Sequence, residues 1–271
     1  MRIESLHIYP VKSARALQLR RVEVQPWGLA GDRRWAVIDE AGNRIAAWKH
    51  PALLRVESRP SSDGLLLTGP GKPLLVPYPN PADRVPVGHT RLDSAALAGP
   101  QANRWFSELL GLPVRLVWLD DPRLRPVSLA HGGEAGDALT FADAAPVLLT
   151  SRASLAQLSD WVAGTAAERG EPAAGALAMS RFRPNVVIDG AEAFAEDGWA
   201  TVRLGPVNFR FGELCDRCVM TTIDQDDLGR GQEPMRTLAR RRRWNGQTWF
   251  GVRLIPVSTG VLGVGDAVVV G

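Results

Sequence analysis

Two cysteines three positions apart carry the clearest chemical signal in the sequence. Cys215 and Cys218 follow a predicted strand that ends at Gly212, and a polar turn holds both thiols. Their separation is too short to close a useful disulfide loop, and the 2 cysteines of the chain are too few for a zinc or iron–sulfur site built on thiolates. We therefore expect these thiols to be reactive rather than structural.

The residues around the pair favour a metal ligand over a redox disulfide, although the C-x-x-C spacing alone also fits an incidental or structural pair. A thioredoxin-type pair begins a helix, whereas residues 219–223 are rich in β-branched side chains and predict a strand. This geometry places Cys218 at a strand edge facing a cavity. Arg217 beside it favours the thiolate form, which is the form that soft metals bind.

The elements that must position these residues are mostly strands. Short alternating segments separated by Gly, Pro, Asn and Asp predict strands over residues 2–9, 17–24, 34–39, 54–58, 65–68, 114–118, 147–150, 185–188, 200–204, 207–212 and 264–270. Helical spacing of apolar residues predicts helices over residues 101–110 and 154–168 and after Glu233-Pro234. We therefore expect a mainly β protein, built as barrels or sandwiches with peripheral α-helices.

Composition limits the kind of protein. With 32 basic and 29 acidic residues the net charge is +3, which is too balanced for a dedicated nucleic-acid-binding protein. The N-terminus shows no signal-peptide pattern, and no stretch approaches the about 20 apolar residues of a membrane helix. We therefore expect a cytoplasmic protein with no membrane contact. A polar stretch near residues 120–138 predicts a boundary between a domain over residues 1–120 and another over residues 121–271.

Polar residues also follow or precede several predicted strands. The segments are Tyr9-Pro10-Val11-Lys12-Ser13, Gly31-Asp32-Arg33-Arg34-Trp35 and Ser180-Arg181-Phe182-Arg183-Pro184-Asn185. Strand ends are common places for a binding site on a β scaffold. Each segment also has an ordinary structural explanation, such as a solvated lysine, an arginine paired with Asp32, or an asparagine in a turn.

These segments, together with the Cys215–Asp224 region and Gly265-Asp266 before the last strand, resemble the MOSC family, named for the C-terminal domain of molybdenum cofactor sulfurase. The chain is most similar to the amidoxime-reducing members, which have a MOSC N-terminal β-barrel domain ahead of the MOSC β-barrel. The resemblance covers nearly the whole chain and keeps the order of the family's motifs. It implies a Mo-pyranopterin cofactor, the molybdenum cofactor, and adds pyridoxal phosphate binding as a further expectation.

The resemblance also implies roles for individual residues. It makes Cys218 the molybdenum ligand. Separately from the resemblance, the position of Asp143 ahead of a predicted strand makes it a candidate proton relay, although it also fits a turn or cap. A cofactor with an anionic phosphate requires cations and hydroxyls around it. The implied cofactor-binding residues are Lys12, Ser13, Arg33, Arg183, Asn185, Arg217 and Thr221. Cys215 either tunes this site or packs as a small apolar residue.

The implied reaction is two-electron reduction of a small N-hydroxylated substrate, such as an amidoxime or an N-hydroxylated base. No cysteine follows Cys218 before the chain ends at Gly271, so we expect electrons from a separate ferredoxin-, flavodoxin- or cytochrome-type protein. The alternative is a sulfur carrier or cofactor-binding module without turnover. The run Arg240-Arg241-Arg242-Arg243-Trp244 leaves nucleic-acid binding, a solvated helix end, or a docking surface for an acidic redox partner open.

Overall fold

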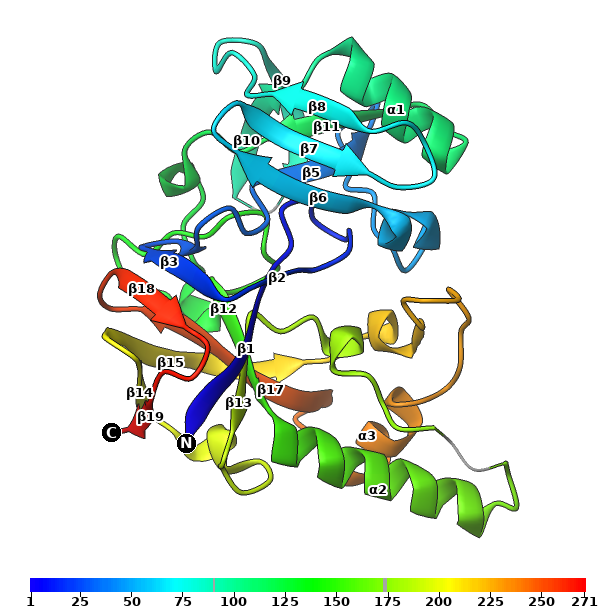
Figure 1. The fold of residues 1–271 in the computed structure, drawn as a ribbon, viewed down its shortest axis with the longest axis vertical. Helices are drawn as coiled ribbons and strands as arrows, with labels where there is room; N and C mark the ends of the chain where they lie inside the picture. The colour runs from blue at the N-terminus through cyan, green and yellow to red at the C-terminus, as the bar shows by residue number, and fades with distance from the viewer. Residues whose placement is uncertain (90, 173–174) are drawn as a thin grey trace. The chain divides into compact units, whose positions relative to one another are not determined.

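The computed structural model describes residues 1–89, 91–172 and 175–271, and these residues form two compact units (Figure 1). Unit 1 consists of Met1–His7, Leu19–Pro26 and Val147–Gly271. Unit 2 consists of Ile8–Gln18 and Trp27–Pro146. Because each unit draws on more than one segment, contacts between residues far apart in sequence define both cores.

Unit 1 is built on one curled sheet. Its strand order is β19-β14-β15-β17-β12-β13-β1, and the neighbouring pairs are antiparallel except for β12 and β13. A parallel pair needs a crossover, and helix α2 (Arg152–Glu168) lies in the connection between these two strands. The strands are β1 (Arg2–Ile8), β12 (Val147–Ser151), β13 (Val186–Asp189), β14 (Thr201–Leu204), β15 (Val207–Asp216), β17 (Gln247–Pro256) and β19 (Val268–Val270).

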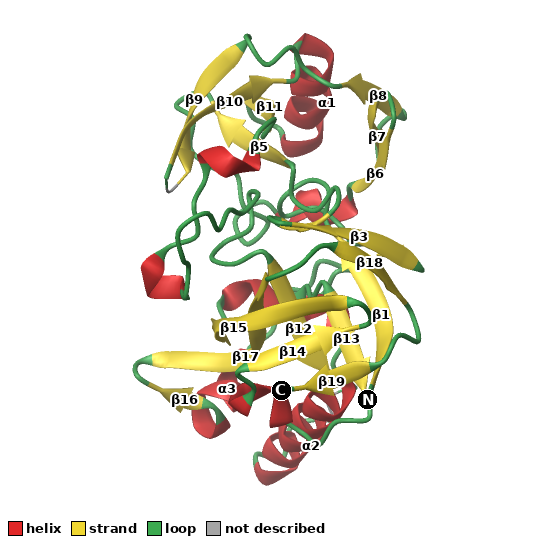
Figure 2. Ribbon diagram, turned by 90° about the vertical axis from the view of Figure 1, so that its left-hand side faces the viewer, coloured by secondary structure: helices red, strands yellow, loops and turns green. Residues whose placement is uncertain are grey.

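Helix α2 and the short helix α3 (Met235–Arg241) pack on an apolar cluster of this unit (Figure 2). The cluster contains Leu158 and Val162 of α2, Leu238 of α3, and the tilted rings of Phe182 and Phe250, whose centroids are 4.1 Å apart. Burying such side chains contributes about 1.5–3 kcal/mol each. Phe182 is thereby fixed one residue before Arg183, so the core of unit 1 reaches the predicted cofactor-binding segment.

The described residues of unit 2 form two antiparallel sheets and one α-helix. The first sheet has the order β5-β11-β10-β9, and the second the order β6-β7-β8. The elements are β5 (Trp35–Asp39), β6 (Glu57–Ser61), β7 (Gly64–Thr68), β8 (Leu74–Pro77), β9 (Arg84–His89), β10 (Leu92–Leu97), α1 (Pro100–Leu110) and β11 (Val114–Trp118). Phe141 packs against the first sheet with Ile38 and Val117.

Shorter elements complete the chain. Strand β3 (Arg21–Gln25) pairs with β18 (Gly260–Gly263), and β16 (Arg243–Trp244) pairs with β17. Strands β2 (Leu17–Leu19) and β4 (Gly28–Leu29) are also short. Turns of 3₁₀-helix occur as η1 (Pro51–Arg55), η2 (Pro122–Leu124), η3 (Leu129–His131), η4 (Met179–Phe182), η5 (Ala195–Gly198) and η6 (Val219–Thr222).

The expected fold class is confirmed, because the described residues are mainly β with three α-helices close to the predicted positions. Several strand predictions were wrong in detail. Residues 17–24 divide into two strands, Leu54 belongs to η1, and of residues 264–270 only Val268–Val270 form a strand. No helix in the described part of the chain is both long and apolar enough to cross a membrane.

The structure corrects the predicted strand at residues 219–223, because Val219–Thr222 form η6 instead. Two threonine hydroxyls explain the difference. Thr221 Oγ1 donates to the carbonyl oxygen of Cys218 at 3.0 Å, and Thr222 Oγ1 donates to that of Val219 at 2.7 Å. Such local bonds compete with strand pairing, so β-branched residues here form a turn.

The buried carboxyl of Glu196 in η5, which bonds to Ser154 near the start of α2, makes the stability of unit 1 depend on pH. Glu196 is fully buried, and its Oε1 accepts a hydrogen bond from Ser154 Oγ at 2.7 Å. Burial raises the pKa of Glu196. The folded state therefore holds this proton more tightly than the unfolded chain, and stability falls as the pH rises from the ordinary glutamate value to the raised one.

We expect Glu196→Gln to remove this decline, since a glutamine can still accept the bond from Ser154 but carries no proton to lose. The free energy of unfolding in urea, measured at several pH values from 4 to 8, should show an advantage of Glu196→Gln over wild type that grows with pH, since the lowered pKa of the buried His89 affects both proteins alike. Glu192→Gln, at an exposed position nearby, is the control. Parallel pH profiles for wild type and Glu196→Gln would contradict the assignment.

Candidate functional site

In unit 1, the two thiols lie in different environments. Strand β15 continues to Asp216, so Cys215 is a buried strand residue rather than part of a turn. Cys218 follows the strand, caps the start of η6 in an extended conformation, and carries an exposed free thiol. Cys218 is therefore accessible to a ligand, whereas Cys215 belongs to the interior.

The guanidinium of Arg217 contacts Cys215, not Cys218. Its Nη1 donates to Cys215 Sγ at 2.8 Å, and its Nη2 donates to the carbonyl oxygen of Phe182 at 2.6 Å. Side chains two positions apart in extended backbone point to the same side, which groups residue 217 with residue 215. The expectation that Arg217 acts directly on the Cys218 thiol is therefore not met in this structure.

Thr221 supports the backbone of Cys218. It is buried, and both its amide and its hydroxyl donate to the carbonyl oxygen of Cys218, at 3.1 and 3.0 Å. These two bonds fix the peptide that follows the thiol. A cofactor contact by Thr221 stays a prediction.

Arg183 and Asn185 follow η4, which ends at Phe182. Arg183 adopts a left-handed conformation, with φ of 56°, and its amide donates to Ser180 O at 3.1 Å. Asn185 is fully buried; its Oδ1 accepts from Leu148 N and its Nδ2 donates to His7 O, both at 3.1 Å. The side-chain carboxamide of Asn185 thus joins β12 to β1. Its predicted cofactor contact is untested.

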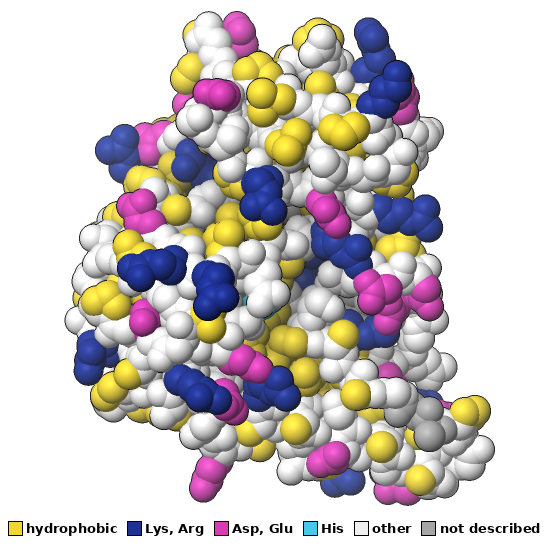
Figure 3. Space-filling model, in the orientation of Figure 1, with side chains coloured by type: hydrophobic (Ala, Val, Ile, Leu, Met, Phe, Trp, Pro, Cys, Tyr) yellow, Lys and Arg dark blue, Asp and Glu magenta, His cyan; other side chains and the backbone are white. Residues whose placement is uncertain are grey.

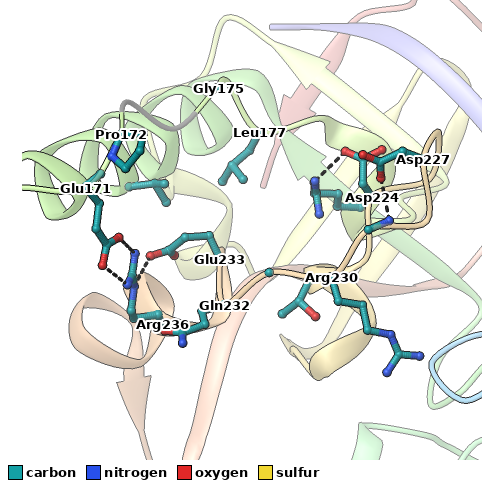
Figure 4. A pocket seen from close by; sticks show the side chains of 16 residues that line it. Glu171, Pro172, Gly175, Leu177, Asp224, Asp227, Arg230, Gln232, Glu233 and Arg236 are labelled. Atoms are coloured by element: carbon teal, nitrogen blue, oxygen red, sulfur yellow. Dashed lines mark hydrogen bonds and ion pairs between the residues drawn. The ribbon is translucent and has the colours of Figure 1, made fainter.

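A cavity of about 610 Å³ lies in unit 1 beside η6 and α2 (Figure 4). Figure 4 shows Glu171 and Glu233 on either side of Arg236, which pairs with each carboxylate at 2.7 Å. Arg181 pairs with Asp224 at 2.6 Å. These charges therefore largely neutralise one another. Cys218 does not line this cavity, which is therefore not the one predicted in front of the thiol.

In unit 2, backbone hydrogen bonds hold two of the predicted segments together. The amide of Arg33 donates to Tyr9 O at 2.9 Å, and that of Trp35 donates to Pro10 O at 3.0 Å. The amide of Lys12 in turn donates to Trp35 O at 2.8 Å. Ser13 follows with φ of 69°, in a turn closed by Ala14 N and Val11 O.

Lys12 is buried and anchored from the segment that carries Asp143. Its Nζ donates to Phe141 O at 2.5 Å and to Asp143 Oδ1 at 2.6 Å. Burial lowers the pKa of Lys12 to about 8, against the opposing effect of Asp143. The ammonium of Lys12 holds the pKa of the Asp143 carboxyl well below its usual range. A carboxylate with so low a pKa is a poor proton relay near neutral pH.

Arg33 is the second cation of this group. Its Nη1 bonds to Asp32 Oδ2 at 2.5 Å, and its guanidinium lies 4.6 Å from the centre of the Tyr9 ring. Burial disfavours its charge, but Asp32 and Tyr9 outweigh this and raise the pKa of Arg33. Its carbonyl oxygen accepts from Phe141 N at 2.9 Å. The structure therefore brings Lys12, Arg33 and Asp143 together within unit 2.

Three further residues of unit 2 join this group and were missed by sequence reasoning. Arg125 is buried and donates to the carbonyl oxygens of Thr140 and, at 2.6 Å, of Ala142. Arg44 lies 3.5 Å from Asp143, and the centre of the buried His89 ring lies 4.9 Å from that of the Phe141 ring, with the two rings tilted. Arg125 lies in the polar stretch that sequence reasoning treated as a domain boundary, and no motif distinguishes it there.

The arginine run at the end of α3 is largely used within unit 1. Arg240 pairs with Glu168 at 3.1 Å, and Arg242 pairs with Asp197 while its guanidinium lies 4.1 Å from the centre of the Phe194 ring. On the face drawn in Figure 3, the described Lys and Arg side chains are interspersed with Asp and Glu. These contacts favour a structural role at the helix end over a nucleic-acid surface.

Comparisons with known proteins identify the family of the chain. A family model described as the MOSC N-terminal beta barrel domain matches residues 1–113, and one described as the MOSC domain matches residues 136–269. Lys12 and Arg33 fall in the first match, and Cys218, Arg217, Thr221, Arg183, Asn185 and Asp143 in the second. Neither description mentions pyridoxal phosphate, so that expectation gains no support.

Similar proteins carry two kinds of name. Mitochondrial amidoxime-reducing component 1 of Homo sapiens is 30% identical, over 98% of this chain and 82% of that protein. The Mus musculus protein of the same name is 33% identical, over 89% of this chain and 71% of that protein. Molybdenum cofactor sulfurase of Danio rerio is 30% identical, over 93% of this chain and 31% of that protein. The chain therefore belongs to the MOSC family, as a member that combines the N-terminal β-barrel domain with the MOSC domain and is related to the amidoxime-reducing components.

Proposed function

We propose that this protein is a molybdenum-cofactor-dependent oxidoreductase that reduces small N-hydroxylated compounds, such as amidoximes and N-hydroxylated bases. The names of its relatives support this proposal. The observation that carries it is the exposed thiol of Cys218 within the residues that match the MOSC domain. An accessible thiolate is a suitable ligand for a soft metal. A cytoplasmic location and a separate ferredoxin-, flavodoxin- or cytochrome-type electron donor stay predictions.

In this proposal Cys218 is the protein ligand of molybdenum. The bonds from Thr221 fix its backbone, and the Arg217 fork between Cys215 and Phe182 ties the end of β15 to η4. These residues orient the thiol without needing to touch the metal. When bound, the molybdenum cofactor would supply the two-electron redox chemistry, and the protein would supply position and charge.

The cations of unit 2 suit the anionic phosphate of such a cofactor. Lys12, Arg33, Arg44 and Arg125 gather around Asp143, and Arg33 is already paired with Asp32. The group therefore carries excess positive charge, which favours an anion. We propose that Lys12, with Ser13 and Arg33, binds the phosphate, and that Arg183 and Asn185 contribute as the family resemblance implies.

The test of the function is turnover by cofactor-loaded protein. Benzamidoxime should be reduced to benzamidine with a chemical electron donor, and molybdenum content should track activity across preparations. The competing candidate, a sulfur carrier or cofactor-binding module, is favoured by the match to molybdenum cofactor sulfurase and by the same exposed thiol. Full molybdenum occupancy without turnover would support that candidate instead.

Anion binding in unit 2 should weaken as the pH rises, because the pKa of Lys12 is about 8. Lys12 is charged below this value and neutral above it, so the affinity for sulfate should fall several-fold between pH 7 and pH 9. Sulfate remains a dianion over this range, and isothermal titration at constant ionic strength measures the effect. In Lys12→Met the affinity should be low at both pH values; an unchanged pH profile in that variant would contradict the assignment.

A further inference from the structure

The ion pair between Lys12 and Asp143 joins a fixed group to an exposed one. The side chain of Lys12 is 9% exposed, whereas that of Asp143 is 71% exposed. Lys12 is held by its own amide, which donates to Trp35 O, and by the bond from Nζ to Phe141 O. Asp143 forms ion pairs with Lys12 and with Arg44. The carboxylate can therefore rotate into solvent while the ammonium stays in place.

The charges that face Lys12 are unequal in sign. Asp143 is the carboxylate that acts on it, while Arg125 and Arg33 are the cations that oppose its charge. Arg33 has Asp32 as its own partner at 2.5 Å. An anion that approaches Lys12 is therefore attracted by several cations. Arg33 neutralises Asp32, so the carboxylate that opposes the anion is that of Asp143. Like charges in contact are costly, so the anion and the carboxylate compete for the same ammonium.

Arg44 is a second cation within ion-pair distance of the Asp143 carboxylate. Arg44 Nη1 lies 3.5 Å from Asp143 Oδ1, the same oxygen that Lys12 holds at 2.6 Å. The Arg44 side chain is 53% exposed, and its backbone is fixed by a bridge to Ile38. A rotation of the Asp143 side chain toward Arg44 would exchange one ion pair for another without a change in the backbone.

From this geometry we infer that Asp143 is a displaceable internal counter-ion, which occupies Lys12 in the absence of ligand and moves to Arg44 when an oxyanion binds. The inference rests on the proposed function, in which Lys12 binds the cofactor phosphate. It adds that Asp143 occupies Lys12 until the phosphate binds. The ligand class is an oxyanion such as a phosphate monoester. The contact with Asp143 gives the buried ammonium of Lys12 a counter-ion in the absence of ligand; a buried charge without one would be costly.

Neutralising Asp143 tests the inference. Asp143→Asn should bind inorganic sulfate about tenfold or more tightly than wild type at pH 7, because the competing charge is gone. Asp63→Asn makes the same change in net charge at the exposed turn between β6 and β7, and it should leave the affinity unchanged. Equal or weaker sulfate binding by Asp143→Asn, in protein with a wild-type circular dichroism spectrum, overturns the inference.

The role of Arg44 is tested by a double-mutant cycle. Arg44→Gln should weaken sulfate binding in the wild-type background, since the displaced carboxylate then has no partner. Its effect should be clearly smaller in the Asp143→Asn background, where there is no carboxylate to receive. Equal effects in both backgrounds would show that Arg44 attracts the anion only by its charge and would overturn this step.

A third variant separates failure of the inference from failure of the proposed function. Lys12→Met should lose sulfate binding in unit 2 whether or not Asp143 is displaced. If Lys12→Met loses binding and Asp143→Asn gains none, the anion site stands and the displaceable counter-ion does not. If Lys12→Met binds sulfate as well as wild type, the anion site itself is wrong and the inference falls with it.

Discussion

Cys218→Ser protein should fold normally and contain almost no molybdenum, with reductase activity reduced in proportion. The hydroxyl of serine is a hard donor that stays protonated at neutral pH, whereas a thiolate is a soft, anionic ligand. Changing groups that merely support a metal ligand already costs about 10–100-fold in affinity, so loss of the ligand itself should cost at least as much. Metal analysis of the purified variant beside wild type measures the effect directly.

The fold should survive this change, because Cys218 is exposed and its side chain does not cap η6 with a hydrogen bond. A thermal unfolding curve close to that of cofactor-free wild type would confirm it. Cys215→Ser is the matched control. Serine can still accept the hydrogen bond from Arg217, so this variant should keep most of its metal. Wild-type molybdenum content in Cys218→Ser would refute the ligand assignment and, with it, the proposed function.

The same segment shows what a sequence pattern captures and what it does not. The pattern predicted that Cys218 lies after a strand, and the structure agrees; the cavity predicted in front of the thiol stays a prediction. It did not predict the direction of the Arg217 side chain, because that depends on where β15 ends. The strand runs to Asp216, four residues past the predicted end at Gly212. Strand ends depend on pairing partners, here β17, which lie far away in the sequence.

Strands with unusual composition were also missed. Strand β9 contains Pro86, and β10 contains Asp93, Ser94 and two alanines, residues with low preference for strands. Both strands nevertheless pair with each other in the first sheet of unit 2. Packing of Val87 and Leu92 in the core with Phe141 outweighs local preference there, and it arises from contacts that no local window contains.

The anion group of unit 2 illustrates the same limit for a site. Sequence reasoning identified Lys12, Arg33 and Asp143 separately, and the structure brings them together although Lys12 and Asp143 are 131 positions apart. It gave Asp143 a proton-relay role because the contact with Lys12 was not visible. Arg125 was not considered at all, since its importance lies in two carbonyl oxygens of residues 140 and 142 that only the fold places beside it.

Asn185→Ala should destabilise the cofactor-free protein by about 2 kcal/mol, because it removes the side-chain partner of two half-buried backbone groups and opens a small cavity. The side chain of Asn185 joins Leu148 N of β12 to His7 O of β1, and both lie beside strand β13, which begins one residue later. Asn185 is fully buried, whereas Leu148 and His7 are half-buried, so water can replace only part of what the lost side chain supplied. Urea unfolding followed by circular dichroism measures the loss.

This result would decide between two roles for Asn185. If its importance lay only in a contact with the cofactor, the cofactor-free variant would unfold at the same urea concentration as the cofactor-free wild type. If it joins the strands, the loss appears without any cofactor, and weaker cofactor retention follows as a consequence of the altered sheet. Asn208→Ala, at an exposed position of β15, should change stability by less than about 0.5 kcal/mol. An equally small change for Asn185→Ala would leave direct cofactor binding as the better explanation of this residue.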